Sequence, residues 1–66
     1  MWVFKDKEMA KLYNKEQMAL VIGLHPQTLR RIISGTQECS KTIAYCITKF
    51  LNVEKEIEDF FYKKGE

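Results

Sequence analysis

One stretch in the first half of the chain has the residue types and the spacing to bind the edges of nucleic-acid bases. When successive residues are placed about 100° apart, as in an α-helix, one face carries Gln27, Arg30, Arg31 and Ser34, with Thr28 at its flank. Arginine can donate two parallel hydrogen bonds to guanine N7 and O6, and glutamine can pair with adenine N6 and N7 in the same way. Serine and threonine hydroxyls reach phosphates or base edges. In isolation such a face is more often simply solvated, so its context decides.

The opposite face of the same helix is apolar. Leu29, Ile32 and Ile33 fall within about a third of a turn, which is the stripe expected of a helix packed on a core. The two adjacent arginines therefore project outward and are not buried among the isoleucines.

The residues before this helix predict a second helix and a tight turn. Asn14 is a good N-cap, and Gln17 three residues later completes a capping-box pattern. Gly23 can take the positive φ that ends a helix, and Pro26 suits the first turn of the next one. The inward positions of QMALVIGLHPQTLRRI then have the spacing of a helix-turn-helix motif at about residues 15–34. In this motif Ala19 is small because the next helix crosses close to it.

The remaining periodicity is helical as well. We expect a first helix at about 5–13, with Met9, Leu12 and Tyr13 on one apolar face, although Trp2-Val3-Phe4 is also β-prone. A fourth helix follows a cap at Ser40, and a fifth runs over about 54–62. The predicted fold class is all-α, a compact five-helix domain that covers residues 1–66.

Length, cysteine content and the shortage of histidine favour a binding module over an enzyme. A chain of 66 residues is one domain at most and has little room for both a core and a pocket. Cys39, Cys46 and His25 do not have the spacing of a zinc site, and no catalytic constellation is present, so we expect no metal, no cofactor and no catalysis. Without a signal peptide or a membrane-spanning run, both cysteines are expected to be reduced thiols in a cytoplasmic protein, with Cys46 in the core.

The charge is unevenly distributed along the chain. Residues 1–51 carry eight Lys or Arg against four Asp or Glu, a net +4, and residues 52–66 carry three against five, a net −2. The basic part suits a polyanion, and the acidic end is expected to point elsewhere.

With the motif in place, the chain resembles the Cro/repressor-type (lambda-repressor-like, XRE) helix-turn-helix family. The resemblance extends over SGTQECSKTIAYCITKFLNVEKEIEDFF, which is similar to the loop, fourth helix and fifth helix of that family, and so covers roughly residues 5–62. The glycine turn and the start of the third helix also resemble the MerR/excisionase winged-helix family. That family needs a β-wing after the motif, where this chain continues into helix, so it ranks second.

The resemblance implies roles for particular residues. Base contacts fall on Gln27, Thr28, Arg30 and Arg31, to which the helical face adds Ser34. Phosphate contacts fall on Lys15, Gln17, Thr36, Gln37 and Lys41. His25 has two interpretations, a phosphate contact or a helix cap, and capping is preferred. Lys15 stands where the family commonly has glutamine, and Pro26 occupies a place often open to a base-contacting side chain.

The function implied is sequence-specific binding of a double-stranded DNA operator by a small Cro-like repressor. We expect a homodimer on a pseudo-palindromic site, in the cytoplasm of a bacterial or phage-infected cell, and a phage or mobile-element origin fits a lone domain. The alternative is a modulator, antirepressor or antitoxin that acts on a second regulatory protein. Its interface would use four apolar or aromatic residues that fall outward, Leu20, Val21, Tyr45 and Tyr62.

Overall fold

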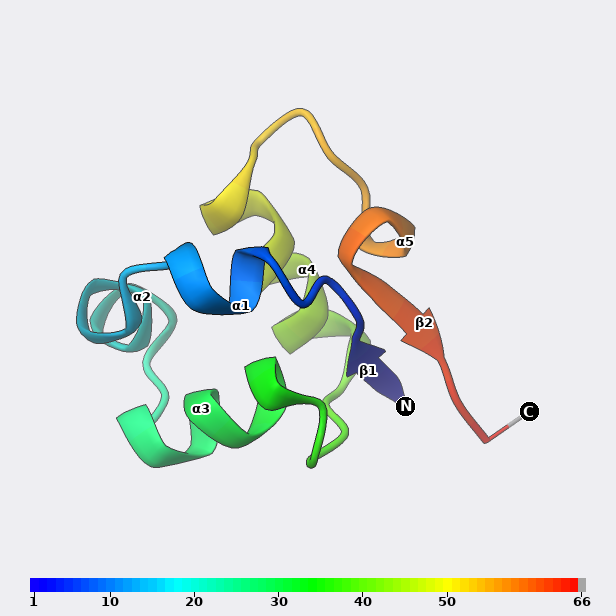
Figure 1. The fold of residues 1–66 in the computed structure, drawn as a ribbon, viewed down its shortest axis with the longest axis horizontal. Helices are drawn as coiled ribbons and strands as arrows, with labels where there is room; N and C mark the ends of the chain where they lie inside the picture. The colour runs from blue at the N-terminus through cyan, green and yellow to red at the C-terminus, as the bar shows by residue number, and fades with distance from the viewer. Residues whose placement is uncertain (66) are drawn as a thin grey trace.

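Helices make up most of the fold, and a short strand lies at each end of the chain (Figure 1). The computed structural model describes residues 1–65. Within them the elements follow in the order β1 (Trp2–Phe4), α1 (Met9–Leu12), α2 (Lys15–Ile22), α3 (Pro26–Ser34), α4 (Lys41–Leu51), α5 (Ile57–Phe60) and β2 (Phe61–Lys63). The five predicted helices are therefore present in this part of the chain and the fold is mostly helical, as predicted, but the all-α class omits a small sheet.

This addition is a two-stranded antiparallel sheet that joins the beginning and the end of the described chain. β1 pairs with β2 in a register that sets Val3 opposite Tyr62 and Phe4 opposite Phe61. The β-prone residues at the N-terminus thus form a strand, and do not extend the first helix. The predicted fifth helix is cut to one turn for the same reason, because the chain becomes extended at Phe61, the first residue of β2.

The first helix is also shorter than predicted. It begins at Met9, whose backbone N–H donates to Asp6 Oδ1 at 3.0 Å, and it ends after Leu12. Leu12 was predicted to face the core, but its side chain is 77% exposed. The other two residues of the predicted face, Met9 and Tyr13, are half-buried and do pack against the core.

The core lies where the helices meet the inner face of the strands. Its buried side chains come from every element except α1, and the largest of those that are fully enclosed are Phe61, Met18, Leu29, Ile47 and Thr48. Phe4 connects the sheet to this core, because its ring meets Phe61 edge to face at 5.1 Å between centroids and stacks on Phe60 at 6.1 Å. The cysteine in the core is Cys39, and the predicted Cys46 is only half-buried.

One side chain of the core, that of Thr48, is polar and lacks a hydrogen-bond partner for its hydroxyl in the described part of the chain. Thr48 lies on α4 and is fully buried. A buried hydroxyl without a partner has lost its hydrogen bonds to water and has no hydrogen bond within the protein to replace them.

We expect Thr48→Val, which keeps the shape of the side chain, to raise the free energy of unfolding by about 1 kcal/mol in a urea titration. Thr42→Val on the exposed face of α4 is the control and should change it little; an equal gain there would mean that the Thr48 hydroxyl is not the cause.

Candidate nucleic-acid interface

The turn between α2 and α3 is fixed by caps on both sides. Asn14 Oδ1 accepts from Gln17 N at 3.1 Å, which confirms the predicted N-cap of α2. At the other end Gly23 has a φ of 87°, and the Ala19 carbonyl accepts from the N–H groups of both Gly23 (2.9 Å) and Leu24 (3.1 Å). Two helices joined this tightly present α3 in one defined orientation.

His25 acts as the cap of α3, as preferred from the sequence. Its Nδ1 accepts from Gln27 N at 3.1 Å, and Pro26 follows at the first helical position. The imidazole ring is exposed at the start of the helix.

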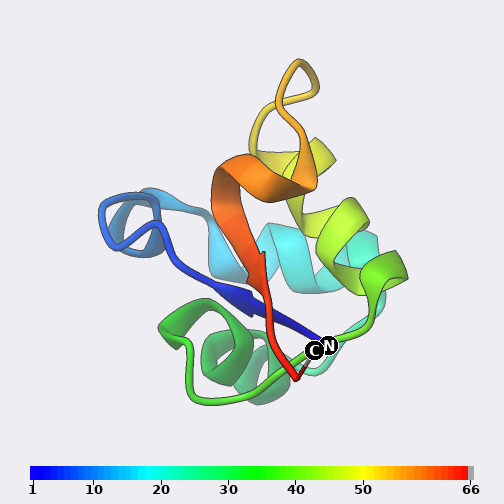
Figure 2. The same cartoon turned by 90° about the vertical axis from the view of Figure 1, so that its right-hand side faces the viewer.

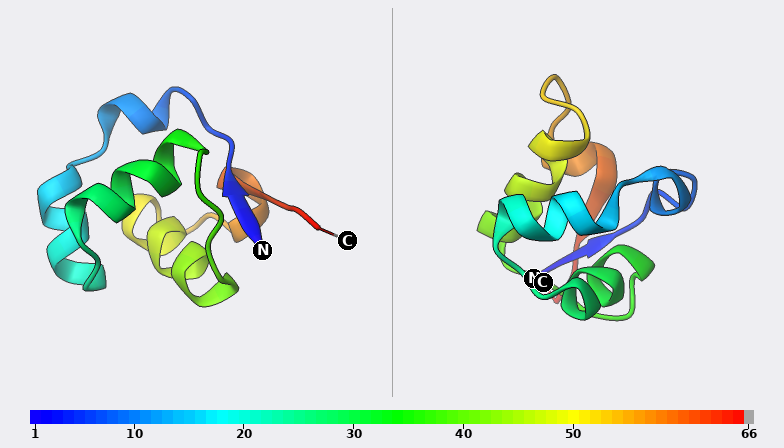
Figure 3. Two further views of the ribbon diagram at one scale, coloured as in Figure 1. Left: turned by 90° about the horizontal axis from the view of Figure 1, so that it is seen from below. Right: turned by 90° about the vertical axis from the view of Figure 1, so that its left-hand side faces the viewer.

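α3 has the two faces that its sequence predicts. Leu29, Ile32 and Ile33 are buried in the core. The opposite face is exposed at Gln27, Arg30, Arg31 and Ser34, and half-buried at Thr28. Seen from below, the helix runs across the front of the molecule with no other element over it (Figure 3).

The two arginines of this face have different neighbours. Burial raises the pKa of the Tyr13 phenol, and the positive charge of Arg30 partly offsets that rise. Arg30 therefore lies on the side of α3 toward the junction of α1 and α2, while Arg31 lies about 100° further round the helix. Two arginines at this offset on one exposed helix face can contact two different base pairs or a base and a phosphate.

The loop after α3 is tied to the helix through one carbonyl group. The Arg31 carbonyl accepts from Thr36 N (3.1 Å), Gln37 N (3.2 Å), Thr36 Oγ1 (3.1 Å) and Ser34 Oγ (2.9 Å). The Ser34 and Thr36 hydroxyls also bond each other at 3.0 Å. Sequence reasoning did not find this cluster, whose signal was two hydroxyl residues on either side of Gly35. It makes α3 and the start of the loop one rigid unit and commits the Ser34 hydroxyl to the helix end.

The residues predicted to hold phosphate flank α3 on both sides. Lys15 (half-buried) and Gln17 (exposed) lie in the first turn of α2. Thr36 (exposed) and Gln37 (half-buried) follow α3, and exposed Lys41 opens α4, whose cap is Ser40 Oγ accepting from Ile43 N at 3.3 Å. The structure thus places cationic and amide groups before and after the exposed face of α3.

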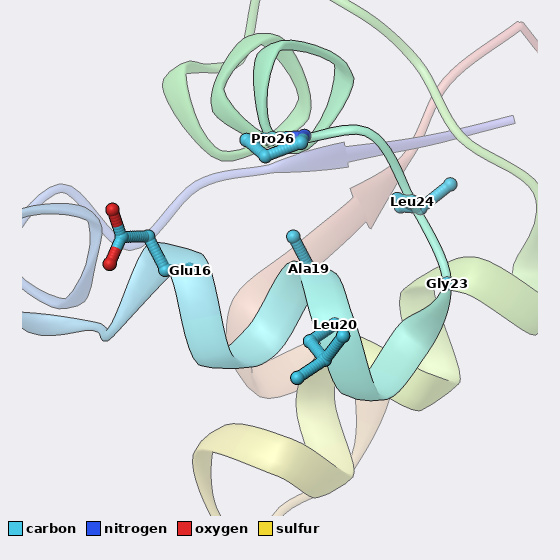
Figure 4. A pocket seen from close by; sticks show the side chains of 6 residues that line it. All are labelled: Glu16, Ala19, Leu20, Gly23, Leu24 and Pro26. Atoms are coloured by element: carbon cyan, nitrogen blue, oxygen red, sulfur yellow. The ribbon is translucent and has the colours of Figure 1, made fainter.

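The four residues predicted as a protein interface are exposed, but they do not form one surface. Leu20 is 83% exposed and Val21 is 65% exposed, and Val21 lines a groove of about 360 Å³ with Tyr45 of α4. A second shallow hollow of about 350 Å³ lies beside Leu20, between α2 and Pro26 (Figure 4). Ala19 points from α2 toward α3 there, and Leu20 points away from it. Tyr62 lies on β2, on the other side of the molecule from α2 (Figure 1).

Other chemistry is limited within the described residues. Burial raises the pKa of the Cys39 thiol to about 11, so it is a protonated core group at neutral pH. Residues 1–65 contain no group of three or more His, Cys, Asp or Glu side chains that is placed to hold a metal ion. No helix in this range has the length and apolar character needed to cross a membrane.

Comparison with known proteins gives one match. A family model described as helix-turn-helix matches residues 7–57, which include α1 to α4 and leave both strands outside. No curated protein and no solved structure shows a significant match to the chain.

Proposed function

The chain belongs to the Cro/XRE-type helix-turn-helix family of DNA-binding regulators, and we propose that it is a small Cro-like repressor that places α3 in the major groove of its operator. In this proposal the binding is sequence-specific, it represses transcription, and the protein catalyses no reaction. A single domain this small contacts little DNA, so we further propose that it acts as a homodimer on two half-sites.

The observation that supports base reading is the exposed polar face of α3. Gln27, Arg30 and Arg31 lie together on a helix whose other face is locked into the core. A rigid helix preserves the geometry that paired hydrogen bonds to a base edge require. The flanking lysines supply attraction to phosphate that does not depend on sequence.

A fluorescence anisotropy titration tests the proposal. The protein is titrated into a random-sequence duplex and into a duplex pool enriched by repeated selection with the protein, each at two salt concentrations. We expect both to bind with affinity that falls by about 0.9 log units per tenfold rise in salt for each phosphate contacted, and the selected pool to bind more tightly. Equal affinity for both pools would refute sequence-specific reading.

A second candidate function is favoured by the apolar groove that Val21 of α2 and Tyr45 of α4 line. Both side chains are at least half exposed, and an exposed apolar patch shared by two helices is typical of an interaction site. In this alternative the chain is a modulator, antirepressor or antitoxin, and the helix-turn-helix fold is a scaffold. Absence of duplex binding at low salt in the titration, with the protein folded, would favour it over the repressor.

A further inference from the structure

The first strand, β1, pairs with the loop that follows α3, and the last strand, β2, pairs in turn with β1. On one edge β1 pairs with this loop, where Trp2 N donates to Cys39 O and Cys39 N donates to Trp2 O, both at 2.9 Å. On its other edge β1 pairs with β2, and the pairing continues with Lys64 N donating to Met1 O at 2.8 Å. The loop, β1 and β2 thus lie side by side next to the end of α3.

Two lysines reach this loop from opposite ends of the sequence. A Cβ placed on Gly35, the residue that ends α3, would lie 4.0 Å from Lys7 Nζ. Lys64 Nζ lies 3.7 Å from Glu38 Oε2, and the Lys64 side chain is 58% exposed. Both ammonium groups therefore lie beside residues 35–38, next to the predicted phosphate ligands Thr36 and Gln37.

The acidic loop before α5 lies far from the loop after α3. Residues 52–66 have a net charge of −2 in the sequence. In space, however, Glu54, Glu56, Glu58 and Asp59 belong to α5 and the loop before it. Figure 2 shows that loop at the opposite end of the molecule from α3 and from the end of β2. The loop before α5, which carries Glu54 and Glu56, therefore lies away from Lys64.

We propose that Lys7 and Lys64 form a second phosphate-binding surface, which holds the DNA backbone beside the loop after α3. The inference rests on the proposed function and extends its interface to segments outside the recognition helix and its flanking caps. Lys64 lies beyond residues 7–57, the part of the chain that the family model matches. The contact is with phosphate and carries no base information.

Replacing Glu38 is expected to tighten DNA binding, whereas replacing either lysine weakens it. Its side chain is 40% exposed and pairs with Lys64 at the surface, where such a pair is weak and screened by salt. A DNA phosphate at Lys64 competes with this carboxylate and is repelled by it. We expect Glu38→Gln to tighten DNA binding about two- to five-fold.

The test uses one duplex taken from the pool enriched by selection, called the selected duplex. We compare the salt dependence of its binding by the wild type, Lys7→Gln, Lys64→Gln and the double variant. Each single variant is expected to reduce the slope of log affinity against log salt by about 0.9, and the double variant by about twice that, with the preferred sequence unchanged. Lys55→Gln is the matched control, because it removes the same charge at the acidic end of the molecule. Thermal unfolding of each variant confirms that the fold is intact.

The outcomes separate this inference from the proposed function. A wild-type slope that Lys7→Gln and Lys64→Gln leave unchanged, or that Lys55→Gln lowers equally, would overturn the second surface while leaving base reading by α3 in place. Failure of the wild-type protein to prefer its selected duplex would instead overturn the proposed function itself.

Discussion

Arg30→Ala/Arg31→Ala is expected to weaken binding to the selected duplex by at least about 30-fold. Each arginine that pairs with a guanine contributes about 1–3 kcal/mol of discrimination, and about 1.4 kcal/mol corresponds to tenfold in affinity. Binding to random duplex should fall less, because the variant keeps the phosphate contacts proposed for Lys15 and Lys41. The measurement is fluorescence anisotropy of both duplexes at low salt.

The control for this double variant is Lys11→Ala/Lys55→Ala. It removes the same number of positive charges from α1 and from the loop before α5, outside the α3 helix. If net charge alone determined affinity, the two variants would bind the selected duplex equally. An equal loss of affinity for the selected duplex in both would show that the arginines act only through charge.

Phe61→Ala is expected to have the largest effect on stability. The Phe61 ring is fully buried at the start of β2 and meets Phe4 of β1 edge to face. Removing a buried phenylalanine side chain costs about 3–5 kcal/mol, which is comparable to the whole stability of a domain of this size. We expect the variant to lose its cooperative thermal transition, followed by circular dichroism at 222 nm.

Tyr62→Ala tests whether this loss comes from the buried ring or from the strand. Tyr62 is the next residue of β2, and its side chain is about half exposed. We expect its free energy of unfolding to change by less than about 1 kcal/mol. A Phe61→Ala protein as stable as the wild type would show that the strand pair is not anchored in the core.

The helix-turn-helix could be predicted from the sequence because its signals are local. Asn14, Gly23 and Pro26 each determine the backbone within one turn of their own position, and Leu29 and Ile32 repeat at helical spacing. The exposed face of α3 follows directly from that spacing. The family match over residues 7–57 confirms the identification of the Cro/XRE-type family.

The strands could not be predicted in the same way because their pairing is not local. Phe4 and Phe61 are opposite each other across the sheet, yet almost the whole chain separates them in sequence. Taken alone, the C-terminal residues from Ile57 fit an amphipathic helix, and only the pairing with β1 makes Phe61 to Lys63 extended. The position of Lys64 beside the loop after α3 depends on this pairing, so it could not be predicted from the sequence either.

The central claim, that α3 reads base edges in the major groove, is tested most directly by changing single atoms of the DNA. Each guanine of the selected site is replaced in turn by 7-deazaguanine, which keeps Watson–Crick pairing but lacks the N7 acceptor that arginine uses. The account predicts that at one or more guanines the replacement weakens wild-type binding about tenfold and leaves the binding of Arg30→Ala/Arg31→Ala unchanged. Wild-type binding that no replacement weakens, or a loss shared equally by both proteins, would contradict it.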